Sequence, residues 1–187
     1  MRCVHEAKFH DVSCFVTLTY DDEHLPVGGT LVYRHFQLFM KRLRKSFPKA
    51  RFFMCGEYGD NTSRPHYHAV LFGVDFRDRV PHARSGSGEV VYASALLSRL
   101  WQLGFASVGD FTFESAAYVA RYVLKKVTGD LAAEHYRSVD LATGEIVDRV
   151  PEFCHMSLKP GIGARWFEQY YDSDVRVRDS IIARVVS

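Results

Sequence analysis

The sequence predicts an α+β protein in which helices pack on one face of an antiparallel sheet. Segments rich in aromatic and β-branched residues alternate along the chain with segments whose apolar residues recur at helical spacing. The chain has 187 residues, of which 47% are hydrophobic and 14% aromatic, so it can bury a sizeable core. No long linker or internal repeat divides it. We therefore expect one domain over residues 1–187, with 130–187 as a carboxy-terminal extension of the same domain.

The first half of the chain supplies most of the expected sheet. A strand is predicted at about 13–20, and two more at about 51–57 and 65–73. Between them, a helix is predicted at about 33–46 because its apolar residues follow helical spacing. These apolar residues are Phe36, Phe39, Met40 and Leu43.

The second half continues the alternation after an irregular segment. The stretch from Asp75 to Glu89 contains proline and glycine and predicts a mobile loop. After it we expect a helix at about 93–102, a strand at about 105–113, a helix at about 114–128, a hairpin from Tyr136 to Val150 and a short helix from Ala164 to Tyr171.

Two histidines on one expected strand indicate a metal site. His66 and His68 are two residues apart, and such residues project from the same face of an extended strand. The preceding strand ends at Glu57, so pairing of the two strands would bring this carboxylate near the histidines. Two imidazoles and one carboxylate suit Mg²⁺ or Mn²⁺ with open positions, whereas a closed structural zinc site would need more soft ligands. A polar strand face without an ion is the alternative interpretation.

A second group of candidate residues lies on the expected helix at about 114–128. At about 100° per residue, Tyr118, Tyr122 and Lys125 fall within about 60° of one another, with Lys126 at the margin of this stripe. The opposite side carries small and β-branched residues, so that side can pack on the core and the tyrosines are not needed there. These inward residues are expected to be Ala116, Ala120, Val123 and Val127.

The tyrosines and lysines fit phosphoryl transfer. A tyrosine hydroxyl has a pKa of about 10, so it needs a nearby cation or metal before it attacks efficiently at neutral pH. Lys125 and Lys126 can supply that charge, and a metal can polarise the phosphate. A second tyrosine one turn away provides a second nucleophile. Surface tyrosines are the alternative, but the adjacent lysines and the upstream histidines favour the catalytic interpretation.

Together these motifs resemble the HUH endonucleases, whose signature is two histidines flanking a bulky residue on a strand, followed by a helix with one or two tyrosines. Four segments look more closely like the replication initiators of microviruses, which are small single-stranded DNA phages. The similarity covers most of the chain and includes the run 156–163, for which the sequence offers no chemical explanation. The four segments are Phe15–Tyr20, Gly56–Gly59, Arg64–Gly73 and Ala117–Lys126.

The resemblance implies a fold similar to the RNA-recognition motif and an enzyme that starts rolling-circle replication in the cytoplasm of an infected bacterium. It implies a site-specific nick in single-stranded origin DNA, a 5′-phosphotyrosyl intermediate and a free 3′-hydroxyl. Carried onto this sequence, the metal ligands are His66, His68 and Glu57, and the nucleophiles are Tyr118 and Tyr122. Which tyrosine attacks first stays open.

The distribution of charge favours contact with nucleic acid. The net charge is only +2, but no acidic residue lies between Glu23 and Glu57, and basic residues there occupy the exposed sides of the helix at about 33–46. A solvated basic face is the alternative. The residues expected to contact DNA are Arg42, Arg44, Lys45, Arg64 and Arg121.

Other expectations concern the compartment and the partners. The four cysteines lack Cys-x-x-Cys spacing and are expected to be reduced thiols. We recognise no signal peptide or membrane-spanning run. No phosphate-binding loop of the Gly-x₄-Gly-Lys-Ser/Thr type is present, so unwinding is expected to need a host helicase.

Two alternatives to the replication initiator stay open. A two-tyrosine HUH transposase would share the chemistry. A non-catalytic module similar to the RNA-recognition motif would instead bind single strands by stacking aromatic side chains on bases. Cleavage that a chelator abolishes would distinguish an enzyme from such a module.

Overall fold

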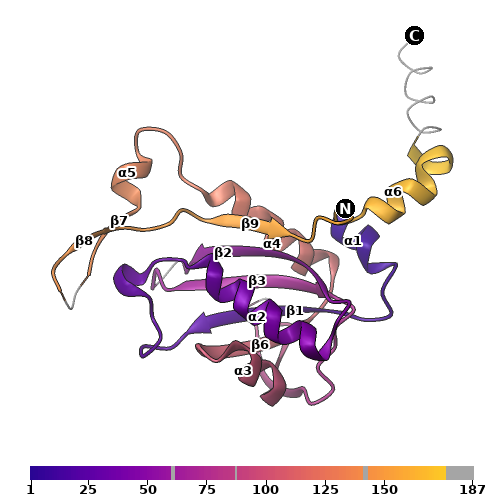
Figure 1. Ribbon diagram of the computed structural model, residues 1–187, viewed down its shortest axis with the longest axis horizontal. Coiled ribbons are helices and arrows are strands. Elements are labelled where there is room, and N and C mark those ends of the chain that lie inside the picture. The colour runs from indigo at the N-terminus through magenta and orange to yellow at the C-terminus, as the bar shows by residue number, and fades with distance from the viewer. Residues whose placement is uncertain (60–61, 87, 141–142, 176–187) are drawn as a thin grey trace, which may run out of the picture.

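The computed structural model describes residues 1–59, 62–86, 88–140 and 143–175, without the side chains of 122–125, 174 and 175. Among these residues, seven strands form one antiparallel sheet in the order β4-β5-β6-β1-β3-β2-β9 (Figure 1). Two short strands, β7 and β8, pair separately. The antiparallel sheet of an α+β protein is therefore confirmed. The strands are β1 (Ser13–Tyr20), β2 (Arg51–Tyr58), β3 (Pro65–Phe72), β4 (Val80–Arg84), β5 (Val90–Ala93), β6 (Gly104–Asp110), β7 (Arg137–Val139), β8 (Ile146–Asp148) and β9 (Phe153–Met156).

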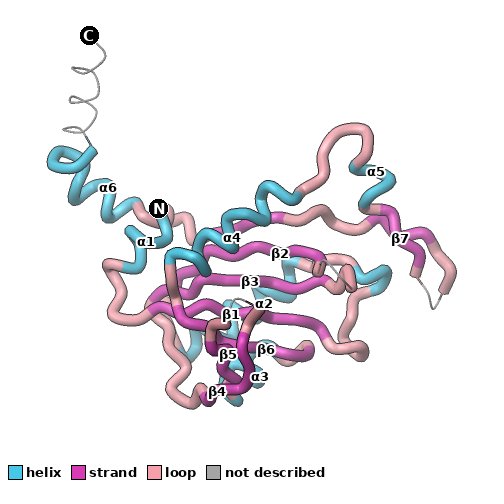
Figure 2. Tube along the Cα trace, turned by 180° about the vertical axis from the view of Figure 1, so that it is seen from behind, coloured by secondary structure: helices cyan, strands magenta, loops and turns pink. Residues whose placement is uncertain are grey.

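Helices cover both faces of the sheet, so the expectation of helices on one face is wrong (Figure 1, Figure 2). One face packs against α2 (Tyr33–Ser46) and α3 (Ala95–Trp101), and the other against α1 (Arg2–Ala7) and α4 (Phe113–Lys125). The reason lies in β3, where the consecutive residues 69–72 are all buried. A strand that is apolar on both sides needs cover on both. The other described helices are α5 (Ala132–His135), α6 (Ala164–Tyr170) and the short turns η1 (Val27–Gly29) and η2 (Tyr171–Val175).

The two faces differ in what they bury. On the side of α2 and α3, alternate residues of β1 such as Val16 and Leu18 join a large core that includes Phe36 and Trp101. The side of α4 holds a smaller cluster, whose members include Val70, Phe72, Ala116, Val119 and Ile162. The part of this second face beyond the smaller cluster is therefore available for polar residues.

Most of the expected elements are confirmed, and one segment is not. The strand at 13–20, the helix at 33–46, the two following strands, the hairpin after Tyr136 and the short helix from Ala164 all form. The stretch from Asp75 to Glu89, expected to be a mobile loop, instead contains β4, which pairs with β5. All five side chains of β4 are exposed, so it lacks the alternation that reveals a half-buried strand. Its Pro81 is tolerated because β4 is an edge strand.

The run 156–163 connects the amino-terminal helix to the sheet. Its Gly163 donates a backbone hydrogen bond of 2.8 Å to the buried Glu6 carboxylate, which also accepts from Arg51 at 2.6 Å. Arg51 in turn donates to the carbonyl oxygen of Pro160. A side chain at Gly163 would lie 3.1 Å from the backbone oxygen of Arg2, and its φ is +78°, so both space and conformation favour glycine. The motif that the sequence left unexplained thus has a structural role.

No helix in the described part of the chain is both long and apolar enough to cross a membrane.

Candidate active site

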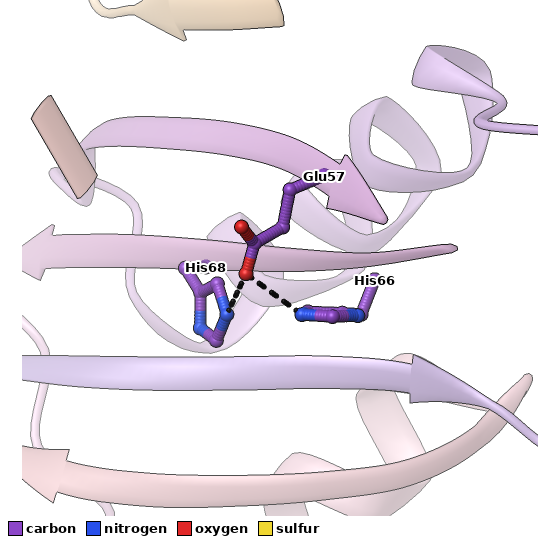
Figure 3. A group of neighbouring side chains, drawn as sticks. All are labelled: Glu57, His66 and His68. Carbon is purple, nitrogen blue, oxygen red and sulfur yellow. Dashed lines mark hydrogen bonds and ion pairs between the residues drawn. The ribbon is translucent and has the colours of Figure 1, made fainter. Parts of the chain in front are cut away.

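Glu57, His66 and His68 meet on the α4 side of the sheet (Figure 3). In the pairing of β2 with β3, Glu57 lies directly opposite His66, and His68 follows two residues later on the same face. The Nε2 atoms of both histidines lie 2.8 Å from the same oxygen, Glu57 Oε1. The hairpin expected from the sequence therefore does bring the three predicted metal ligands together.

The hydrogen bonds of His66 leave one ring nitrogen in need of a cation. Its Nδ1 lies 2.9 Å from the carbonyl oxygen of Arg64, and its Nε2 faces Glu57, so both partners are acceptors. A neutral imidazole carries one N–H and can satisfy only one of them. A proton on Nδ1 satisfies the carbonyl and leaves the Nε2 lone pair for a metal, an arrangement that metal-bound histidines favour.

The electrostatics of Glu57 and His68 also suit metal ligands. Burial opposes ionisation of Glu57, but the hydrogen bonds from His66 and His68 outweigh it and lower the pKa of the carboxyl. Burial lowers the pKa of His68 and so favours the neutral imidazole, against the opposing effect of its hydrogen bond to Glu57. An ionised carboxylate and neutral imidazoles are the forms that bind metals.

Glu57 has a second oxygen that the three residues do not satisfy. Its Oε2 is buried and has no hydrogen-bond partner among the described residues. Ligand atoms of Glu57, His66 and His68 all lie within 4.8 Å of one another. An unsatisfied buried carboxylate oxygen is costly, and a cation bound by this group of residues would compensate for it. The residues therefore fit a metal ion.

β1 supplies two residues that the sequence did not identify as part of the site. Thr17 lies opposite His68, and its Oγ1 is 2.9 Å from His68 Nδ1. The Phe15 ring stacks beside the His68 ring, with centroids 5.4 Å apart and planes 16° apart. Both residues lie on the inward side of a strand whose alternation was visible, but only the register of β1 against β3 shows which histidine they contact.

The predicted nucleophile Tyr118 lies beside this cluster. Its ring centroid is 5.0 Å from that of His68, with the two planes at 90°, and 6.2 Å from that of Phe15. The Tyr118 side chain is 38% exposed, so substrate can reach it. Ala116 and Val119 are buried against the sheet and fix this part of α4.

The first turn of α4 is stabilised by its own cap. The Ser115 backbone N–H donates to Thr112 Oγ1 at 3.1 Å, and the Thr112 N–H donates to Ser115 Oγ at 2.9 Å. Two of the helix's unsatisfied amide groups thereby find partners. The helix that carries Tyr118 therefore begins at a defined residue.

The expected inward face of α4 is partly wrong. Ala116 is buried as expected, but Ala120 is exposed, and Val119 takes the other buried position. Val127 lies beyond the end of the helix and is half-buried. The spacing of apolar residues cannot determine the angle at which a helix meets a sheet, and the contact of Tyr118 with His68 is part of what determines it here.

Three other predicted residues of α4 and its end have limited description. The side chains of Tyr122 and Lys125 lie outside the described residues, and so does that of Val123. Lys126 is exposed directly after the last residue of α4. Their predicted roles stay predictions.

The predicted DNA-contacting residues fall on different surfaces. Arg42, Arg44 and Lys45 belong to α2, which packs on the face opposite the metal cluster. Arg42 there donates to the carbonyl oxygens of Leu100 and Trp101, 2.7 and 2.9 Å away, and so caps the end of α3. DNA contact by this helix stays a prediction, but it would not be continuous with the cluster.

The remaining two arginines lie on the elements of the site. Arg64 donates to the carbonyl oxygen of Tyr20 at 3.0 Å and pairs with Asp22, while its own carbonyl oxygen accepts from His66. Arg121 is exposed on α4. Their predicted contact with DNA also remains a prediction.

A family of replication-associated proteins, described by its ORF2 members, matches residues 13–127, which include the cluster and the whole of α4. This range is more than half of the chain. The chain belongs to this family. Membership in this replication-associated family confirms the resemblance to replication proteins of the microvirus type.

Individual relatives come from several phages. The chain is 36% identical over 182 residues to replication-associated protein VP4 of Bdellovibrio phage phiMH2K, covering 92% of this chain and 53% of that protein. It is 35% identical over 173 residues to replication-associated protein ORF2 of Spiroplasma virus 4, covering 86% and 50%. The match to replication-associated protein ORF4 of Chlamydia phage 1 is 36% over 135 residues, covering 67% and 34%. The chain thus spans about half the length of the first two relatives, and no solved structure matches it.

Proposed function

We propose that this protein is a metal-dependent HUH endonuclease and strand transferase that starts rolling-circle replication of a single-stranded DNA phage. The observation that carries the proposal is the contact of Tyr118 with His68, which brings a candidate nucleophile to a candidate metal cluster. The relatives named replication-associated proteins support a role in phage replication. The substrate would be single-stranded DNA at the phage origin, in the cytoplasm of the infected bacterium, with unwinding left to a host helicase.

The metal would be held by Glu57, His66 and His68. When bound, Mg²⁺ or Mn²⁺ would polarise the scissile phosphate and stabilise the charge that develops on it. Three protein ligands leave open positions for water and phosphate oxygens, which such hard cations prefer. Thr17 and the Arg64 carbonyl orient the two imidazoles through their Nδ1 atoms.

The covalent step would use the tyrosine hydroxyl. Tyr118 Oη attacks the phosphorus and loses its proton, the P–O3′ bond breaks, and the 3′ oxygen leaves and takes up a proton. The products are a 5′-phosphotyrosyl DNA end and a free 3′-hydroxyl that can prime synthesis. Attack of a 3′-hydroxyl on the same phosphorus reverses the step and releases the tyrosine. Lys125 and Lys126 would offset the negative charge, and Tyr122 would serve as a second nucleophile.

The test is formation of a covalent adduct with single-stranded phage-origin DNA in Mn²⁺. We expect an adduct that survives denaturation and maps to Tyr118 or Tyr122, and its absence with chelator. Tyr171→Phe is the matched control, since Tyr171 is 43% exposed and lies outside α4. An undiminished adduct in the Tyr118→Phe, Tyr122→Phe double variant would exclude both tyrosines.

The same assay separates the alternatives. A non-catalytic binding module would bind the strand without forming an adduct in any metal. A two-tyrosine transposase would form the adduct with transposon ends in preference to phage-origin strands. His66→Ala is expected to abolish the adduct, whereas His24→Ala, which removes an exposed histidine outside the cluster, is expected to leave it unchanged.

A further inference from the structure

One cross-strand row of the sheet joins the metal cluster to an exposed aromatic side chain. Glu57 of β2 lies opposite His66 of β3, His66 lies opposite Thr19 of β1, and Thr19 lies opposite Phe105 of β6. Residues that are directly opposite in antiparallel strands project from the same face. Phe105 therefore points to the same side of the sheet as the cluster, about 10 Å from His66, since neighbouring strands are about 4.8 Å apart.

The sheet face around Phe105 is not covered by α4. This helix packs on β2, β3 and β9, and Figure 2 shows it on the β2 side of the sheet and not across β1 and β6. Thr17, Thr19 and Ser107 on this face are half-buried, and Phe105 is 70% exposed. The result is a shelf of hydroxyl groups beside the cluster, ending in an apolar ring.

The backbone that carries Phe105 is held in one position. Gly104 before it has a φ of +133°, and a Cβ there would lie 2.2 Å from the backbone N of Asp21 and 2.6 Å from the oxygen of Thr19. Only glycine fits so close an approach. Asp21 donates a backbone hydrogen bond to the Leu103 oxygen at 3.1 Å, and Trp101 Nε1 donates to the Thr19 oxygen at 3.0 Å. Phe105 thus projects from a preorganised strand end.

We propose that Phe105 is a stacking platform for an unpaired base of the DNA strand whose phosphate lies at Glu57, His66 and His68. This inference rests on the proposed function, because the phosphate at the cluster sets where the strand runs. Single exposed apolar residues are common on protein surfaces, but this one continues the row of the metal ligands on an uncovered face. Aromatic rings on a sheet bind single strands by stacking, which tolerates any base because every base has a flat π-face.

The geometry also limits which base is held. A span of about 10 Å corresponds to about three nucleotides at the helical rise of about 3.4 Å per nucleotide, and to fewer when the strand is extended. The stacked base is therefore one to three nucleotides from the scissile phosphate. Such a contact positions the substrate, and it would bring the phosphate to the nucleophile as well as add affinity.

The test uses origin oligonucleotides that carry the fluorescent base 2-aminopurine at each of the positions nearest the mapped nick. Binding is measured in Mn²⁺ with the Tyr118→Phe, Tyr122→Phe protein, so that no cleavage intervenes. We expect quenching at one position, its loss on adding Phe105→Ala, and its retention with Phe105→Trp. The affinity should fall by roughly 5- to 150-fold in Phe105→Ala, the range for loss of one base–aromatic stack.

Two controls keep this inference separate from the proposed function. Phe167→Ala removes another half-exposed ring, 50% exposed on α6, and should change neither quenching nor affinity. Wild-type protein must form the covalent adduct with the same oligonucleotide, and failure there counts against the proposed function. An adduct-forming protein whose Phe105→Ala variant keeps full affinity and quenching would overturn the platform. So would a Phe105→Ala variant that changes only the oligomeric state.

Discussion

Thr17→Val removes the hydroxyl that holds His68 Nδ1 at 2.9 Å while keeping the shape of the side chain. A neutral His68 that binds a metal through Nε2 carries its proton on Nδ1 and donates it to Thr17. Loss of a partner for a buried donor costs about 1–3 kcal/mol. Loss of such an orienting contact weakens metal binding by about 10- to 100-fold. Part of the cost falls equally on the metal-free protein, so we expect the lower part of that range, about 10-fold.

The assay is calorimetric titration of the metal-stripped protein with Mn²⁺ in the absence of DNA. Thr19→Val is the matched control, because Thr19 lies two residues further along β1 on the same face and opposite His66. We expect its Mn²⁺ affinity to match that of the wild type. Wild-type affinity in Thr17→Val, or an equal loss in both variants, would show that the Thr17 hydroxyl does not tune the site.

Three further predictions concern stability. Mn²⁺ at about 100 times its Kd should add about 2.7 kcal/mol and raise the Tm by about 5–11 °C, and His66→Ala should remove this shift in a thermal scan. Burial opposes ionisation of Glu6, but hydrogen bonds from Gly163, His10 and Arg51 outweigh it and lower the pKa of Glu6 below its ordinary 4.5. Its carboxylate therefore stabilises the fold above that pH, and the contribution disappears as the pH falls through the folded-state pKa. Glu6→Gln should lower the Tm at pH 7 by about 6–12 °C, for a loss of about 3 kcal/mol, and should flatten the acid dependence of Tm, whereas an unchanged profile would remove Glu6 from this role. In urea unfolding, Val119→Ala should cost about 2 kcal/mol and Ala120→Ser under about 0.5 kcal/mol, and the reverse order would restore the inward face expected from helical spacing.

The sequence predicted best what depends on local periodicity. The strand from Ser13 to Tyr20 and the helix from Tyr33 to Ser46 were predicted at their observed bounds, because alternation and helical spacing are strong in both. The metal cluster was predicted because His66 and His68 share a strand face and Glu57 ends the strand before it. All three inferences needed only residues close together in the chain.

The missed features depend on lateral register or on contacts between distant segments. Thr17 and Phe105 acquire their places only because β1 lies between β3 and β6, an order that no local pattern shows. The basic residues of α2 were expected to contact DNA, but Arg42 serves a helix end contributed by residues nearly sixty positions later. Strand β4 was missed because its exposed side chains have no burial pattern to detect.

The site combines a fixed part with a part that packing positions. Glu57 and His66 face each other across the β2–β3 ladder, so backbone hydrogen bonds set the spacing of the metal ligands. Tyr118 instead comes from a helix whose position depends on the burial of Ala116 and Val119. A change in that packing moves the nucleophile and leaves the ligands in place. Since small displacements from the attack geometry are costly in rate, Val119→Ala should reduce adduct formation while Mn²⁺ affinity stays at its wild-type value.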